Sequence, residues 1–230
     1  MAGKHVNEST RVTDFFAQSL AEDESLTKKQ QQILLAALNL FSDKGFDRTT
    51  TADIAQRAGV AEGTVYKRYK TKQELLNAIM TLFVTRVVPR TASEFGRTDW
   101  GSTEMSLHEL LTTVIENRID FIVANYRQLK IMLGEVLNNA PMRDRILVLV
   151  KEDVFGVMLP RLQHLRASHQ IVDWPDDMLV QFIGGTLFAL AIRLMMDMPV
   201  QSLPDQKQKI VQFLERGLGM ETERSAPVRS

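Results

Sequence analysis

Residues 50–72 constrain the fold of this chain more than any other stretch, because they specify two short helices and the turn between them. Thr50 offers a hydroxyl that can cap the first helix, and apolar residues three and four apart form one face of it up to Ala58. Gly59 can adopt the positive φ that ends a helix abruptly. A second short helix follows over about 61–69, so the pattern predicts a helix-turn-helix, whose second helix lies in the DNA major groove.

The outward face of the second helix predicts contact with DNA. Val65 is its core residue, so at about 100° per residue Gly63 and Lys67 point outward, with Thr64 and Tyr66 on the flanks. A bare backbone, two hydroxyls and a cation suit close approach to DNA and contact with phosphate. The alternative from this face alone is a small helical hairpin with a solvated basic surface.

The wider segment, residues 33–80, resembles the DNA-binding domain of the TetR family of transcriptional repressors. The resemblance covers roughly a fifth to a quarter of the chain and is carried by Ile33-Leu34, Ala36-Ala37, Leu40-Phe41, Gly45-Phe46, Thr50-Thr51, Ile54-Ala55, Ala58-Gly59-Val60, Gly63-Thr64, Tyr66, Tyr69, Lys72 and Leu75-Leu76. It implies a homodimer that binds DNA and a small molecule. The predicted DNA contacts are Thr50, Thr51, Glu62, Gly63, Thr64, Tyr66, Lys67, Arg68, Tyr69 and Lys72, with Lys72 on a phosphate.

The chain departs from the family pattern at the start of the second helix, where Ala61 replaces the usual capping hydroxyl and Glu62 follows. Three roles for Glu62 stay open. Its carboxylate can accept from a cytosine amino group, exclude phosphate and so sharpen specificity, or stabilise the N-terminus of the helix.

Charge is unevenly distributed in a chain whose net charge is zero. Residues 27–90 carry eleven basic and five acidic groups, a balance of +6, while the segments on either side carry −3 each. This distribution is typical of a DNA-binding head on an acidic body, although chance clustering gives similar blocks. The chain has no cysteine, and its N-terminus lacks the apolar stretch of a signal peptide, so we expect a cytoplasmic protein.

Hydrophobic periodicity predicts an all-α fold. The resemblance to the TetR family implies that it is divided into an N-terminal three-helix DNA-binding domain and a C-terminal helical domain for ligand binding and dimerisation. The expected domains are a poorly ordered or short-helical extension over 1–26, the DNA-binding domain over 27–72, the helical domain over 73–219 and a disordered tail over 220–230. The expected later elements are a helix over 71–88 stopped or kinked by Pro89, a loop or broken helix over 91–106, and helices over 105–125, 126–139, 141–170 (kinked at Pro160), 173–196 and 204–217.

The last two helices predict a dimer interface. The helix over 173–196 is apolar nearly all round, so it must be covered on both sides, and its uncharged stretch is too short to span a membrane. The predicted interface residues are Phe182, Gly185, Leu187, Ala189, Leu190, Ile210, Phe213 and Leu214. The alternative is burial of both helices inside one monomer.

Catalytic and metal-binding motifs are missing from the sequence, and the four histidines are scattered, so we expect no enzyme activity, metal or cofactor. The predicted effector contacts are Arg118, Ile122, Glu135, Asn138 and Met158, on otherwise apolar helices. Each is equally explained as a surface, capping or core residue.

The sequence therefore predicts a dimeric, ligand-responsive transcriptional regulator of the TetR type, acting as a repressor on a near-palindromic operator and released by a small apolar effector. The alternative function is an all-α small-molecule-binding or carrier protein in which the helix-turn-helix has a structural role only.

Overall fold

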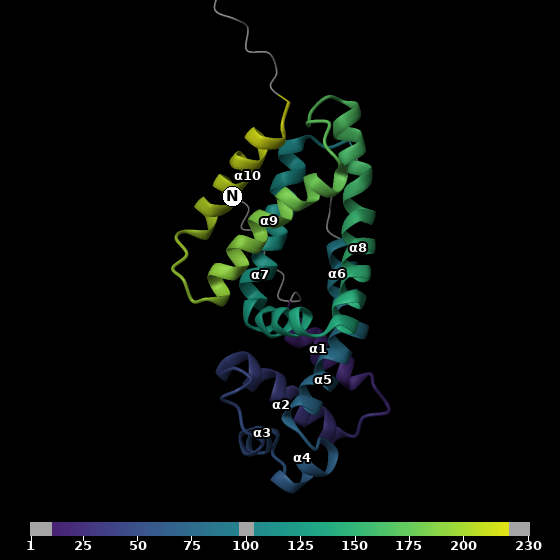
Figure 1. Cartoon of the computed structure of the whole chain (residues 1–230), viewed down its shortest axis with the longest axis vertical. Helices are drawn as coiled ribbons and strands as arrows, with labels where there is room; N and C mark the ends of the chain where they lie inside the picture. Colours follow the sequence, from purple (N-terminus) through teal and green to yellow (C-terminus); the bar gives the residue numbers. More distant parts are fainter. Residues whose placement is uncertain (1–10, 97–103, 221–230) are drawn as a thin grey trace, which may run out of the picture. The chain divides into compact units, whose positions relative to one another are not determined.

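The computed structural model describes residues 11–96 and 104–220, which are almost wholly helical (Figure 1). Within that part of the chain the one β feature is an isolated bridge between Ile171 and Gly219. The elements are α1 (Val12–Ala21), α2 (Lys28–Lys44), α3 (Thr51–Ala58), α4 (Glu62–Arg68), α5 (Lys72–Leu82), the π-helix η2 (Phe83–Val87), α6 (Val88–Gly96), α7 (Leu107–Asn138), α8 (Ala140–Ala167), α9 (Asp176–Met195) and α10 (Leu203–Leu218). The all-α prediction is confirmed.

The chain forms two compact units whose borders differ from the expected domains. The first unit comprises Met1–Gly96 and Phe121–Asp153, and the second comprises Arg97–Asp120 and Val154–Ser230. The helix-turn-helix thus shares a unit with the second half of α7 and the first half of α8. Both helices are continuous across the border.

The local sequence explains each helix end in the head, α2 to α5. Thr27 and Gln30 form a capping box that begins α2, and Gly45 ends it with φ of 88°. Thr50 caps α3 by accepting from the backbone N–H of Asp53. Gly59 then turns the chain with φ of 66°, a left-handed conformation that a side chain would strain.

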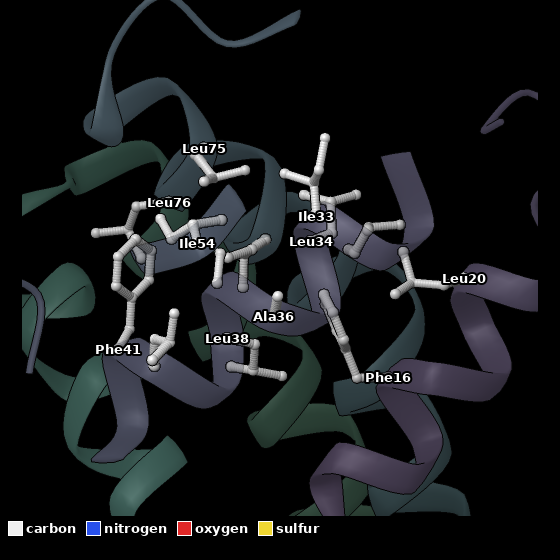
Figure 2. Packing of buried hydrophobic residues seen from close by; sticks show 14 of the residues in the cluster. Phe16, Leu20, Ile33, Leu34, Ala36, Leu38, Phe41, Ile54, Leu75 and Leu76 are labelled. Carbon is white, nitrogen blue, oxygen red and sulfur yellow. The ribbon is translucent and has the colours of Figure 1, made fainter. Parts of the chain in front are cut away.

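A single hydrophobic cluster holds the first unit together (Figure 2). Its centre is formed by fully buried side chains of α2, α3 and α5, including Ile33, Ile54 and Leu75. Each is 0–1% exposed, so every one of these helices buries its apolar stripe in the same core. Half-buried residues of α7 and α8, such as Ile131 and Met142, pack against this cluster.

The N-terminal extension contributes a helix, α1, to this core. Phe16 is fully buried, and its ring stacks on Phe83 of η2 with centroids 5.3 Å apart. Asn125 of α7 accepts a hydrogen bond of 2.8 Å from the backbone N–H of Val12, which satisfies a free donor at the start of α1. Residues 1–10 lie outside the described part of the chain.

The helix that follows the head continues past Pro89 instead of stopping there. Pro89 has no N–H to donate and would clash with a carbonyl one turn earlier. The structure accommodates it by widening the preceding turn to the π-helix η2, after which α6 runs to Gly96. Of the two predicted alternatives for residues 91–106, a loop or a broken helix, residues 91–96 are helical, while residues 97–103 lie outside the described chain.

The prediction of separate helices over 105–125 and 126–139 is also wrong. Residues 107–138 form one helix, α7, because nothing at Asn125 or Tyr126 breaks the hydrogen-bond ladder. Pro160 lies inside α8, as expected. In the second unit α9 and α10 pack as neighbours and match the predicted helices closely (Figure 1).

By length and composition α9 is apolar enough to cross a membrane, the one such helix among the described residues, contrary to the expectation from its short uncharged stretch. The side that carries Leu179, Ile183 and Leu187 is buried against the second unit. The other side is exposed and also carries apolar side chains, among them Phe182 and Phe188.

The docking of α1 gives a stability test. Phe16→Ala should lower the free energy of unfolding by about 3–5 kcal/mol, because the lost ring leaves a cavity against Phe83. The measurement is urea denaturation of the full chain. Leu137→Ala, at a side chain that is 69% exposed, is the control and should change stability by less than about 0.5 kcal/mol. Equal, small effects of both substitutions would contradict the docking of α1.

Candidate nucleic-acid interface

The second helix of the helix-turn-helix, α4, presents the predicted face to solvent. Val65 is fully buried and anchors the helix, while Tyr66 is 48% exposed. Lys67 and Arg68 are exposed and Thr64 is half-buried. The backbone orientation that achieves this follows from the left-handed Gly59, because α3 and α4 both need their apolar side on the shared core.

Gly63 lies on this exposed face, and a Cβ built there would meet no atom within 4 Å. The protein itself therefore does not require glycine for space at this position. A bare backbone on the exposed face of α4 permits close approach of a second molecule.

Three predicted DNA contacts are brought together at the exposed edge between α3 and α4. The Thr51 hydroxyl lies 3.0 Å from Oε1 of Glu62 and 2.9 Å from the hydroxyl of Tyr66. The three residues were each predicted to contact DNA, but the hydrogen bonds between them were not predicted from the sequence. The signal was available in the spacing, because Glu62 and Tyr66 are four residues apart and share one helix face.

The Thr50 side chain caps the N-terminus of α3. Its hydroxyl accepts from the N–H of Asp53, and Asp53 accepts from the N–H of Thr50 at 3.0 Å. That backbone hydrogen bond, followed by the contact with Lys44, lowers the pKa of Asp53. The charged form therefore stabilises the head at neutral pH, and this contribution is lost as the pH falls through the lowered pKa.

Lys72 has hydrogen-bond partners within the head that the sequence did not predict. Its Nζ donates to the carbonyl oxygens of Phe46 at 2.6 Å, Thr49 at 3.0 Å and Asp47 at 3.2 Å. The ammonium also lies 4.4 Å from the centre of the Phe46 ring, a cation–π contact. All three ammonium protons are thus directed to the loop before α3, so Lys72 positions that loop, and its contact with a DNA phosphate stays a prediction.

Tyr69 is likewise half-buried, and it packs against the hydrophobic cluster of the first unit. Burial raises the pKa of its phenol, and a hydrogen bond to Gln30 partly opposes that shift. Its ring therefore contributes to the packing between α4 and α2, in addition to any contact its edge makes with DNA.

The five predicted effector contacts fall in different units. Arg118 and Met158 belong to the second unit, where Met158 is 3% exposed and burial lowers the pKa of Arg118 to about 10. Ile122, Glu135 and Asn138 belong to the first unit, and the Asn138 amide donates to the carbonyl of Gly134 at 2.7 Å. The five residues thus do not form one site within a single unit.

Two surface hollows contain none of those five residues. The larger, about 540 Å³, lies between α7 and α10 in the second unit, with His108 Nδ1 2.6 Å from Oε1 of Glu215 on its wall. The smaller, about 280 Å³, lies between α5 and the start of α8 in the first unit. Among the described residues, no group of three or more histidine, aspartate and glutamate side chains is placed to hold a metal ion.

The predicted dimer residues divide into buried and exposed sets. Leu187, Leu190 and Leu214 are 2–9% exposed, so the chain covers them itself. Phe182 and Phe213 are 45% and 67% exposed. The exposed side of α9 and α10 also includes Gly185 and Ala189 from the predicted set, and Met178 and Phe188, which that set left out; Ile210 is half-buried.

Comparison with known proteins agrees with this geometry. Residues 33–79 match the family model described as bacterial regulatory proteins, tetR family. The chain is 31% identical over 197 residues to an uncharacterised helix-turn-helix transcriptional regulator of Bacillus subtilis, YvdT, an alignment that covers 83% of this chain and 95% of that protein.

Solved structures share the fold at lower identity. The transcriptional regulator FadR of Bacillus subtilis, in complex with stearoyl-CoA, superposes with a TM-score of 0.59 at 20% identity, over 81% of this chain and 97% of that one. A regulator from Saccharomonospora viridis in complex with choline gives a TM-score of 0.62 at 16% identity, over 83% and 97%. The chain belongs to the TetR family: it is a transcriptional regulator with a DNA-binding helix-turn-helix.

The position of Lys72 gives a test that separates positioning from phosphate contact. Lys72→Met should lower the stability of the head by about 1–3 kcal/mol, because three carbonyl groups lose a charged donor. The slope of log affinity against log salt should stay unchanged for DNA binding. Lys67→Met, at an exposed position on α4, should leave stability unchanged and reduce the magnitude of the slope by about 0.9 for each chain bound to the DNA. A reduced slope in folded Lys72→Met would restore the phosphate role.

Proposed function

We propose that the protein is a homodimeric repressor that binds a near-palindromic operator through α4 of each chain and is released by a small, mainly apolar effector. The observation that carries the proposal is the combination of an exposed, basic helix-turn-helix face with an uncharged stripe on α9 and α10. We propose repression because a regulator bound at its operator excludes other proteins from the same DNA. We place it in the cytoplasm with its DNA.

The stripe supports the homodimer. Met178, Phe182, Gly185 and Phe188 follow one another at three or four residues along α9, so they form one exposed helix face without a charge. Phe213 adds an exposed ring on the neighbouring α10. Contiguous apolar surface on a soluble protein marks an interaction site. A second copy of the chain, presenting the same stripe, would cover it by a two-fold axis.

The small residues in the stripe support close packing of the partner helix. Gly185 and Ala189 lie one turn apart between the exposed aromatic rings. Small side chains let two helix backbones approach, and the rings on either side then fill the remaining space. The buried leucines of α9 and α10 would serve the interface indirectly, by fixing both helices against the second unit.

The path from effector to DNA follows from the composition of the first unit. The head packs with the second half of α7, where Arg127 Nη1 lies 3.0 Å from Oδ1 of Asp43 on α2 and Asn125 caps α1. α7 runs without interruption in the chain from the second unit into the first, and we propose that an effector bound along its first half acts on the head through this helix. An effector would then act by favouring a spacing of the two heads that does not fit the operator.

The effector site we propose lies along α7 and α8, with Arg118 and Met158 as its contacts in the second unit. Arg118 is a half-buried cation that follows the buried Val114 and Ile115, and one polar group among apolar side chains is the pattern of a site that orients a mainly apolar ligand. The roles of Ile122, Glu135 and Asn138 stay predictions. Stearoyl-CoA and choline, which the two structural relatives hold, are the first candidates to titrate.

The dimer is tested by charging the exposed stripe. Phe188→Glu combined with Phe213→Glu should give a folded monomer in sedimentation experiments, because each two-fold interface would bury four unpaired carboxylates. Gln212→Glu, at an exposed residue beside Phe213, is the control and should remain dimeric. A double variant that sediments as a dimer would place the interface elsewhere.

The operator is tested by footprinting on DNA selected from a random pool. Two recognition helices related by a two-fold axis should protect two half-sites whose centres are about 34–36 Å apart, or a multiple of one helical turn. Titration with an effector should then reduce affinity by about 5- to 150-fold, the range of a coupling of 1–3 kcal/mol. Protection of one asymmetric half-site would contradict the two-headed arrangement.

A further inference from the structure

The link between Thr51, Glu62 and Tyr66 fixes the direction of their hydrogen bonds. A carboxylate has no proton to donate, so the Thr51 hydroxyl must donate to Glu62 at 3.0 Å. That donation uses the one proton of Thr51. The contact of 2.9 Å between Thr51 and Tyr66 therefore requires the phenol to donate to Thr51. The phenol proton of Tyr66 thus points to Thr51, and the Thr51 proton points to the Glu62 carboxylate.

This arrangement leaves only acceptors on the outer side of the cluster. The second oxygen of Glu62, the lone pairs of the Tyr66 oxygen and the remaining lone pair of Thr51 all accept hydrogen bonds. A DNA phosphate is also an acceptor and is negatively charged, so it is repelled by Glu62 and receives no proton from Tyr66. The cluster therefore fits a donor on DNA, and the donors in the major groove are the amino groups of cytosine and adenine.

We infer that Glu62 is a specificity-determining residue that accepts a hydrogen bond from the N4 amino group of a cytosine in each half-site, with Thr51 and Tyr66 as its positioning residues. This inference rests on the proposed operator binding. Glu62 is exposed in the first turn of α4, next to the bare backbone of Gly63, so the base edge can approach it closely.

Cytosine fits this acceptor better than adenine does. In an A·T pair the adenine amino group stands between two acceptors, adenine N7 and thymine O4, and both repel a carboxylate. In a C·G pair the cytosine amino group has an acceptor on one side only, because the other side is the C5–H edge. The negative charge of Glu62 therefore favours C·G over A·T and strongly disfavours an approach to guanine N7 and O6.

The hydrogen bonds from Tyr66 to Thr51 and from Thr51 to Glu62 fix the position of the carboxylate that would contact the base. A glutamate on an exposed helix surface ordinarily samples several rotamers, and ordering it on binding costs conformational entropy. Hydrogen bonding through Thr51 to α3 holds one carboxylate oxygen of Glu62 before DNA arrives, so less entropy is lost. Tyr66→Phe removes the phenol's donation and should weaken base discrimination less than loss of the carboxylate does.

The test compares the wild-type chain with Glu62→Gln, an isosteric change at an exposed position. Each full-length protein selects duplexes from a random pool, and affinities are then measured for the selected site and for duplexes with one base pair changed. The wild type should require cytosine at one position of each half-site by roughly 5- to 150-fold. Glu62→Gln should reduce that preference to less than about 3-fold and bind random DNA more tightly, because a like charge is removed.

A second arm uses a duplex in which that cytosine is replaced by 2-pyrimidinone, which lacks the 4-amino group. Wild-type affinity should fall by at least 5-fold, while Glu62→Gln should bind both duplexes equally. A purely structural role for Glu62 predicts an unchanged base preference in Glu62→Gln, and that result would overturn the inference while leaving operator binding intact. If the wild type itself enriches no sequence, the proposed function fails, and this inference fails with it.

Discussion

The ammonium group of Lys72 is the interaction on which the DNA-binding surface depends. It joins the first turn of α5 to three carbonyl groups of the loop that leads into α3. That loop delivers Thr50, which caps α3, and Thr51, which holds Glu62 and Tyr66 of α4. A cation on a flexible stem can satisfy three differently oriented carbonyls at once, which an apolar contact cannot do.

The hydrogen bonds of Lys72 also connect the loop before α3 to the helices that follow the head. Because α5 leaves the helix-turn-helix directly and continues through η2 into α6, the loop before α3 moves with the start of that long helical run. The π-helix η2, which ends two residues before Pro89, is the one described place where this run departs from α geometry. α1 packs on η2 through Phe16 and Phe83, and Arg86 in η2 forms an ion pair with Asp23. The head, α1 and the second half of α7 therefore respond as one body.

The sequence predicted most of the helices and the buried faces of the head. Caps and glycines act locally, so Thr27, Thr50, Gly45 and Gly59 marked helix ends where the structure has them. The errors arose where a residue's effect depends on distant packing. Asn125 looked like the end of a helix, yet its side chain binds the start of α1 and α7 continues.

The candidate site was predicted by residue type but not by partner. A lysine at the start of a helix looks the same in sequence whether it binds phosphate or carbonyl groups, and only the folded loop brings Phe46 and Thr49 to Lys72. The sequence also did not show which residues of α9 form the exposed stripe. In a helix that is apolar all round, the sequence does not say which side the chain covers, so Leu187 and Phe188 were indistinguishable before the packing of α9 was known.

The most direct measurement of the central claim is a fluorescence anisotropy titration of the full chain with a selected duplex and a scrambled duplex, repeated over a range of salt concentrations. The account predicts two chains per duplex, specific binding tighter than scrambled binding by about 10³-fold or more, and affinity for both that falls as salt rises. Equal affinity for the two duplexes, or no binding at low salt, would contradict it and would favour an all-α ligand-binding protein whose helix-turn-helix is structural only.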